Sequence, residues 1–328
     1  MKGQCRVTIF NKRLRFEFDI RRNITVVRGD SATGKTTLIG MLSNYEQNGV
    51  ASGITVNCAK KCVVLDSIRW QVNLQSISDS IVFIDEGEKF IGSDEFAAAV
   101  GASDNYFVLI TRHNLPNLPY SVQEIYGIRI SQKYAGFKQI YNEFYPLYEA
   151  DKQEYGSDSA VMVIEDSKSG FEFFETVYGK KYQCVSAQGK SNVYRLLLAC
   201  SEKTCIVVAD GAAFGAEIER IYHLMEDGRK IYLFLPESFE WLLLKAHFSE
   251  NNAVAKVLEA PENYIDSKAY ISWERFFTDF LIKQTAGTYW QYSKQHINPV
   301  YLHEKNLPKM VNAIQNYGRK SEKEMQDS

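Results

Sequence analysis

Residues 29–36 have the types and spacing needed to hold a phosphate chain. They are Gly29, Asp30, Ser31, Ala32, Thr33, Gly34, Lys35 and Thr36, and Thr37 follows. The two glycines let the backbone approach phosphate oxygens, so that consecutive N–H groups converge on one phosphate. A helix that begins after the second glycine adds the positive end of its dipole. Lys35 could then bridge the β- and γ-phosphates, and the Thr36 hydroxyl could bind Mg²⁺.

A pair of acidic residues further along the chain could complete this chemistry. The segment SIVFIDEGE is an apolar strand that ends in Asp85 and Glu86. Asp85 could hold Mg²⁺ through water, and Glu86 could orient or deprotonate a water that attacks the γ-phosphate. We therefore expect ATP and Mg²⁺ as cofactors. The chain has no Asn-Lys-x-Asp sequence for guanine recognition, which favours ATP over GTP.

Together the two segments resemble the Walker A and Walker B motifs of P-loop NTPases. This resemblance implies an ATPase with Lys35 and Glu86 as catalytic residues. In such ATPases a polar residue at the end of the strand beside the Walker B strand often senses the γ-phosphate, which makes Thr111 a candidate. Arg112 is a candidate arginine finger, acting within the chain or across a homo-oligomer. A capping or surface role is the alternative for both. The hairpin before the glycine loop resembles the start of ABC-type ATPases, although no LSGGQ-like sequence follows.

The second half of the chain carries a pattern that resembles the Toprim domain of topoisomerases, primases and OLD-family nucleases. Strand 161–164 ends in Glu165, a loop reads GKSN at 189–192, and strand 204–209 ends in Asp210, with Gly215 shortly after. The resemblance implies that Glu165 and Asp210 bind Mg²⁺, since carboxylates at adjacent strand ends form a hard oxygen site.

This second pattern departs from the family at two positions. Ala212 stands where a second aspartate belongs, and Asp166 stands where glycine is usual. Loss of a carboxylate weakens a second metal position, so two-metal cleavage is not expected. Pro236 is expected to start a helix, with Glu237 in its first turn as a further candidate for the acidic site.

The elements that must position these residues suggest two α/β domains. Apolar strands are expected at 5–10, 14–20, 24–28, 53–57, 61–65, 80–84 and 106–111, with a closing hairpin within 123–147. A helix is expected at 35–46. This pattern predicts a P-loop domain with a parallel sheet over residues 1–150. After a linker at 151–159, a second strand and helix alternation predicts a Toprim-like α/β domain over 160–260. A helical extension (261–317) and a disordered tail (318–328) complete the chain.

Composition fits a globular protein of this size. The 328 residues are 45% hydrophobic and carry a formal net charge of −2, so no overall field attracts nucleic acid. Only the first 28 residues are strongly basic. The six cysteines match no usual disulfide or zinc spacing and are expected to be reduced core thiols. No apolar run approaches a membrane span, so we expect a cytoplasmic protein without a membrane segment.

An ATPase joined to a Toprim domain is the arrangement of the OLD family, which occurs in phage defence and mobile elements. The leading expectation is an ATPase whose nucleotide state controls a Toprim-like module that processes or binds nucleic acid. One alternative is an ATPase switch with a catalytically dead domain that binds a partner protein. Another is a small-molecule phosphotransferase, which Glu86 disfavours because a water-activating group suits hydrolysis.

Overall fold

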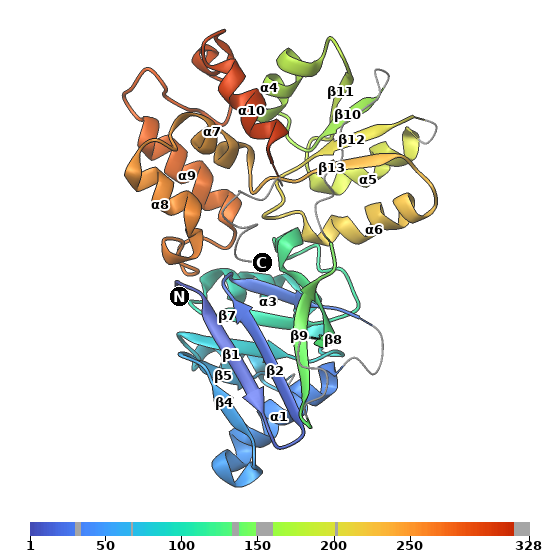
Figure 1. Ribbon diagram of the computed structural model, residues 1–328, viewed down its shortest axis with the longest axis vertical. Helices are drawn as coiled ribbons and strands as arrows, with labels where there is room; N and C mark the ends of the chain where they lie inside the picture. Colours follow the sequence, from blue (N-terminus) through green and yellow to red (C-terminus); the bar gives the residue numbers. More distant parts are fainter. Residues whose placement is uncertain (30–33, 67, 133–137, 149–159, 201–202, 318–328) are drawn as a thin grey trace. The chain divides into compact units, whose positions relative to one another are not determined.

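The computed structural model describes residues 1–29, 34–66, 68–132, 138–148, 160–200 and 203–317. The chain divides into two compact units, each containing a β-sheet and helices (Figure 1). Unit 1 consists of residues 1–148 and 260–272, and unit 2 consists of residues 149–259 and 273–328. The helical extension expected at 261–317 is therefore divided between the units. The predicted linker at 151–159 and the predicted tail lie outside the described residues.

Unit 1 is built on a nine-stranded mixed sheet in the order β4-β1-β2-β9-β8-β3-β7-β6-β5. The strands are β1 (Cys5–Phe10), β2 (Leu14–Ile20), β3 (Ile24–Val27), β4 (Thr55–Asn57), β5 (Lys61–Val64), β6 (Ser80–Ile84), β7 (Tyr106–Ile110), β8 (Ile125–Ile130) and β9 (Ile140–Pro146). Neighbouring strands are parallel along the series β8, β3, β7, β6 and β5. Strand β1 pairs antiparallel with β2 and with β4, and β9 pairs antiparallel with β8. The expectation of a parallel sheet is thus correct only for the part from β8 to β5. The remaining part is mixed, because the strands of the hairpins belong to the same sheet.

The central strands of unit 1 consist of apolar residues without alternation. Every residue of β3, β6 and β7 is buried, as a parallel strand covered on both faces requires. The helices are α1 (Lys35–Asn48), α2 (Trp70–Gln75) and α3 (Asp94–Ala102), with short 3₁₀ turns η1 (Gly49–Ser52), η2 (Lys89–Gly92) and η3 (Val122–Glu124). Leu38 and Leu42 of α1 belong to the same buried cluster as Ile81 and Phe83 of β6. The sheet therefore fixes the position of α1.

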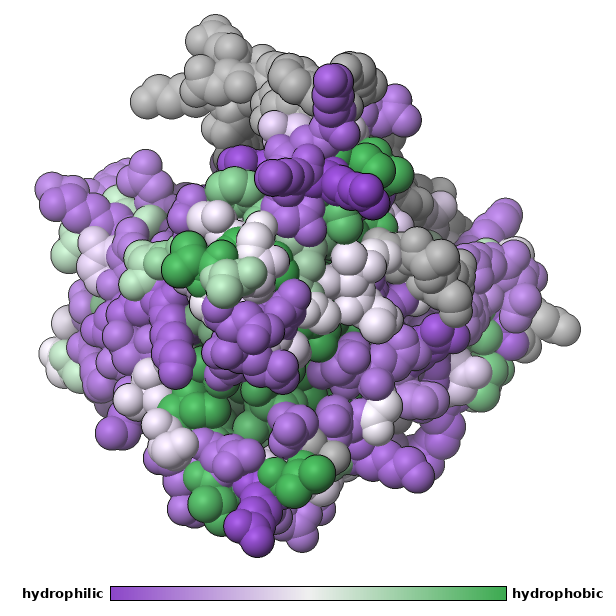
Figure 2. Space-filling view, turned by 90° about the horizontal axis from the view of Figure 1, so that it is seen from below, coloured by the Kyte–Doolittle hydropathy of each residue, from purple (hydrophilic) through white to green (hydrophobic). Residues whose placement is uncertain are grey.

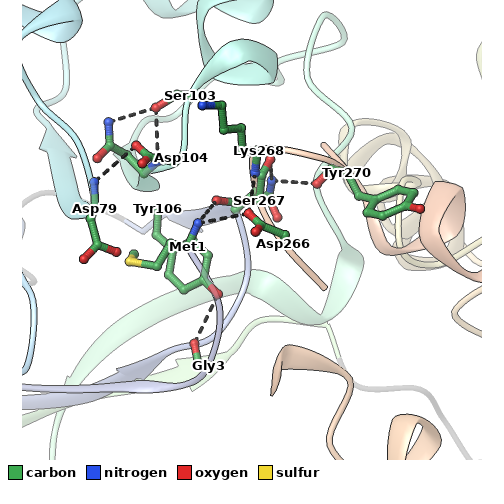
Figure 3. Close-up of polar contacts among 12 residues, drawn as sticks. Met1, Gly3, Asp79, Ser103, Asp104, Tyr106, Asp266, Ser267, Lys268 and Tyr270 are labelled. Carbon is green, nitrogen blue, oxygen red and sulfur yellow. Dashed lines mark hydrogen bonds and ion pairs between the residues drawn. The ribbon is translucent and has the colours of Figure 1, made fainter. Parts of the chain in front are cut away.

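Segment 260–272 is a late part of the chain that packs into unit 1 (Figure 3). It begins with the 3₁₀ turn η5 (Pro261–Asn263). The side-chain amide of Asn23 donates hydrogen bonds to the carbonyl oxygens of Ser267, at 3.1 Å, and Tyr270, at 2.9 Å. The Met1 nitrogen donates to the Ser267 hydroxyl at 2.7 Å. These contacts connect the segment to the strands of the N-terminal region.

Unit 2 contains a four-stranded parallel sheet in the order β11-β10-β12-β13. Its strands are β10 (Val161–Ile164), β11 (Gln183–Ser186), β12 (Cys205–Val208) and β13 (Ile231–Phe234). Its helices are α4 (Ser169–Tyr178), α5 (Lys190–Ala199), α6 (Gly215–Glu226), α7 (Phe239–His247), α8 (Asn252–Glu259), α9 (Trp273–Thr285) and α10 (Leu307–Gln315), with the 3₁₀ turn η6 (Pro299–Leu302). Helix α7 contacts α8, α9 and α10, which form a helical layer with it (Figure 1).

The molecular surface is mainly hydrophilic on the face drawn in Figure 2, where hydrophobic residues form small separate areas. Among the described residues, we find no helix with the length and apolar character that a membrane crossing needs.

Candidate functional site

Residues 28–34 connect β3 to α1, and of these residues 28, 29 and 34 are described. Gly34 has a φ of 95°, a left-handed conformation that favours glycine, and α1 begins at the next residue. Lys35 is only 5% exposed, and its ammonium donates a hydrogen bond to the carbonyl oxygen of Gly29. Thr36 and Thr37 are exposed at the start of the helix. The expected ligands Asp30, Ser31, Ala32 and Thr33 lie outside the described residues.

The strand order brings the other candidates of unit 1 to the same edge of the sheet. Strand β7 lies between β3 and β6, and all three are parallel. Val27 pairs with Ile110, and Leu109 pairs with Ile84. Asp85 and Thr111 follow β6 and β7 directly. They therefore leave the sheet at the same edge as Arg28 and Gly29, which follow β3.

The side chains at this edge are already engaged in contacts with one another. The Asp85 carboxylate accepts a hydrogen bond from the Glu86 backbone nitrogen at 2.7 Å. The Nε atom of Arg112 lies 2.5 Å from Oε1 of Glu86. Thr111 is buried, and its hydroxyl accepts from the His113 backbone nitrogen at 3.0 Å. Arg112 thus pairs with the residue expected to activate water.

In unit 2 the predicted acidic residues follow two neighbouring strands. Ile164 pairs with Val208, so Glu165 and Asp210 leave adjacent parallel strands at the same edge. Asp210 Oδ1 accepts a hydrogen bond at 3.0 Å from the backbone nitrogen of Phe239, the first residue of α7. Both carboxylate residues line a small pocket with about 20 Å³ of space for water-sized molecules, which is room for about one water.

Three functional candidates of unit 2 were missed by the sequence analysis: Glu240 on α7, Glu274 on α9 and Lys294 in the loop after α9. The Lys294 ammonium lies 3.1 Å from Oε1 of Glu274 and 3.8 Å from Oε1 of Glu240. Oε1 of Glu240 also accepts a hydrogen bond from the Tyr292 hydroxyl at 2.8 Å. Glu240 is 1% exposed, and its other oxygen, Oε2, has no hydrogen-bond partner among the described residues. That oxygen is a buried acceptor without a partner among the described residues, which costs stability unless a donor or a positive charge offsets it.

Burial and mutual charge link the pKa values of these groups, which form one electrostatic cluster. Burial, followed by the charge of Glu274, raises the pKa of Glu165 to about 7. Burial, followed by Glu274 and Glu240, also raises the pKa of Asp210 well above its usual value. Burial alone would lower the pKa of Lys294, but Glu240 and Glu274 outweigh it and raise that pKa. The carboxylates of the cluster therefore share a deficit of positive charge that Lys294 relieves in part.

The two departures from the expected pattern have visible structural consequences. The Asp166 carboxylate accepts hydrogen bonds from the backbone nitrogens of Ser167 and Gly170, both at 2.8 Å, at the start of α4. It is therefore engaged in the turn before that helix. Ala212 is buried, and its backbone nitrogen donates to the Glu237 carbonyl oxygen at 3.3 Å.

The helix expected to start at Pro236 begins three residues later, which explains why Glu240 was missed. Ser238 precedes α7, and its hydroxyl accepts a hydrogen bond from the Trp241 backbone nitrogen at 3.1 Å. A serine in this position is a typical helix cap. Recognition of Ser238 as the cap would have placed Glu240 in the first turn.

Within the described part of the chain, no group of three or more His, Cys, Asp or Glu residues is arranged to hold a metal ion. Comparison of the chain with models of protein families found no matching family, and comparison with curated proteins found no matching relative.

Proposed function

We propose that the protein is an ATPase of the P-loop class, whose nucleotide state controls a Toprim-like unit that binds nucleic acid. The observation that supports ATP binding best is the position of Lys35. It is the first residue of α1, directly after a glycine loop that follows a buried parallel strand, and its ammonium contacts the loop backbone at Gly29. An ammonium held within such a loop is suited to replace this contact by one to a phosphate oxygen.

The residues around Lys35 provide the remaining functions that hydrolysis needs. The Thr36 hydroxyl and Asp85 would hold Mg²⁺, which neutralises charge on the phosphates when it is bound. Glu86 would accept the proton of the attacking water. Thr111 follows the strand between β3 and β6, which is a suitable position for contact with the γ-phosphate. Arg112 would have to release Glu86 before that carboxylate could act.

For unit 2, we propose that Glu165 and Asp210 bind a single divalent cation and that the unit does not cut nucleic acid. The pocket that they line is small, and burial, followed by the charge of neighbouring carboxylates, raises the pKa values of both groups. Lys294 supplies positive charge beside Glu274 and Glu240. A fixed ammonium can neutralise carboxylates, but it cannot act as the second metal of a two-metal cleavage site.

The experiment that tests the ATPase assignment is a titration of the full chain with Mg²⁺ and ATP. Lys35→Ala should weaken binding at least ~30-fold, because loss of one partner of a buried charge pair typically costs about 2–5 kcal/mol. Lys61→Ala, at an exposed position, is the matched control and should bind as the wild type does. Equal ATP affinity of Lys35→Ala and wild type would exclude the proposed site.

A second experiment tests the role of unit 2. The wild type should bind labelled DNA or RNA with an affinity that differs between ADP and a non-hydrolysable ATP analogue, and it should leave the strands intact in Mg²⁺ or Mn²⁺. Cleavage by the wild type that is lost in Asp210→Asn would show that the acidic site is an active nuclease. Absence of nucleic-acid binding in both nucleotide states would instead favour the second candidate, a domain that binds a partner protein. Ala212 and Lys294 are consistent with this candidate, because neither residue can supply a second metal position.

A further inference from the structure

Three cysteines of unit 1 lie together, although their spacing in the sequence matches no usual motif. Cys5 begins β1, Cys58 follows β4, and Cys62 lies on β5. The antiparallel pairing of Thr8 with Asn57 places the chain after β4 alongside the first part of β1. All three thiols are free, and the Cys62 thiol donates a hydrogen bond at 4.0 Å to the carbonyl oxygen of Lys60, which lies midway between Cys58 and Cys62 in the chain.

The surroundings of Cys58 favour its thiolate form. Its sulfur also accepts a hydrogen bond from the Lys60 backbone nitrogen at 3.4 Å. The neighbouring thiol of Cys5, followed by that of Cys62, holds the pKa of Cys58 well below its usual range. The proximity of Cys58, together with burial, raises the pKa values of Cys5 and Cys62. Lys60 and Asp79 are charged residues that act on this cluster, and their Nζ and Oδ1 atoms are 2.7 Å apart.

The two neighbours of Cys58 differ in accessibility and in how firmly they are held. Cys5 is 4% exposed, and β1 is hydrogen-bonded on both sides, by β2 and β4. Cys58 and Cys62 are half-buried, and β5 is the last strand of the sheet, paired with β6. A disulfide needs sulfur atoms about 2.05 Å apart, so one partner must move. Cys62 can do so at lower cost than Cys5.

We propose that Cys58 is a site of oxidation by hydroperoxides and that Cys62 converts the product into a disulfide. The thiolate attacks one oxygen of hydrogen peroxide, the O–O bond breaks, and Cys58 becomes a sulfenic acid while hydroxide leaves. The Cys62 thiol then attacks the Cys58 sulfur, a Cys58–Cys62 disulfide forms, and the sulfenic oxygen leaves as water. Cys5 remains a thiol.

The test is peptide mapping of the full wild-type chain after treatment with hydrogen peroxide. The expected product is a Cys58–Cys62 disulfide that a thiol reductant reverses. Cys58 should react a few-fold faster than Cys184 at pH 7, because Cys184 is almost entirely protonated there, while the lower nucleophilicity of an acidic thiolate offsets most of the gain. Cys184 serves as the internal control, since burial raises its pKa to about 11.

Two variants separate the roles of the three thiols. Cys62→Ser should stop at the sulfenic acid, which dimedone traps at Cys58, and Cys5→Ala should still form the Cys58–Cys62 disulfide. A Cys5–Cys58 disulfide in the wild type would overturn the assignment of Cys62. Oxidation of Cys58 no faster than that of Cys184 in the wild type would overturn the proposal, and this result does not depend on the folding of any variant.

Discussion

Nε of Arg112 lies 2.5 Å from Oε1 of Glu86, so a cation two residues beyond β7 is paired with a carboxylate two residues beyond β6. The side chains of Arg112 and Glu86 are 52% and 34% exposed. An exposed pair of this kind typically stabilises a protein by no more than about 1 kcal/mol. The pair therefore matters more for the orientation of Glu86 than for folding.

Glu86→Gln should retain ATP binding and slow ATP hydrolysis by roughly 10²- to 10⁴-fold, the usual cost of losing a general base. The measurement is phosphate release under saturating ATP, alongside a binding titration. Glu88→Gln, two residues further on, is the control and should hydrolyse ATP at the wild-type rate. Unchanged hydrolysis by Glu86→Gln would mean that another group activates the water.

Arg112→Ala should raise the basal rate of ATP hydrolysis a few-fold, because it frees the Glu86 carboxylate. Its free energy of unfolding in urea should fall by no more than about 1 kcal/mol, as expected for an exposed pair. A drop of tenfold or more in hydrolysis, with ATP affinity unchanged, would instead show that Arg112 stabilises the transition state as an arginine finger.

Glu165→Gln should stabilise the protein at pH 8 and have little effect near pH 4.5. Because the pKa of Glu165 is raised from 4.5 to about 7, the folded protein binds this proton more tightly than the unfolded chain. Stability from this group is therefore greatest below pH 4.5 and declines as the pH rises to about 7. The gain at pH 8 should be about 1–3 kcal/mol, measured by urea unfolding at both pH values. Glu175→Gln, at an exposed position on α4, is the matched control and should change the free energy of unfolding by no more than about 0.5 kcal/mol.

Asn23→Ala should destabilise unit 1 by about 1–3 kcal/mol, because it leaves two carbonyl oxygens of segment 260–272 without their donor. Limited proteolysis should then cut within 260–272 sooner than in the wild type. Asn44→Ala, on an exposed face of α1, is the matched control. Equal proteolysis of Asn23→Ala and wild type would show that other contacts hold the segment.

Local patterns were sufficient to place most strands and the candidate residues that follow them. Strands β6 and β10 agree with the expected ranges, because each is a short apolar run that ends at a carboxylate. The acidic cluster of unit 2 was beyond such reasoning. Glu240, Glu274 and Lys294 are distant from Glu165 in the sequence, and only the packing of α9 on α7 brings them to one place.

The thiol cluster and the mixed sheet were missed for a related reason. The sequence shows Cys5 and Cys58 as unrelated positions, since their proximity depends on the pairing of β1 with β4. Similarly, the hairpins were recognised as hairpins, but nothing local indicates that β2 runs parallel to β9 within one continuous sheet. Pairings between distant strands determine both features.

The division of unit 1 into residues 1–148 and 260–272 has a consequence for its synthesis. A ribosome completes the nine strands of the large sheet well before it makes the segment that accepts hydrogen bonds from Asn23. During that interval, while β10 to β13 emerge, the Asn23 side-chain amide lacks the two carbonyl oxygens to which it donates in the complete chain. A truncated product that ends before residue 260 would retain Gly34 and Lys35 but lack the segment that accepts hydrogen bonds from Asn23, and it should be a preferred target for chaperones and proteases.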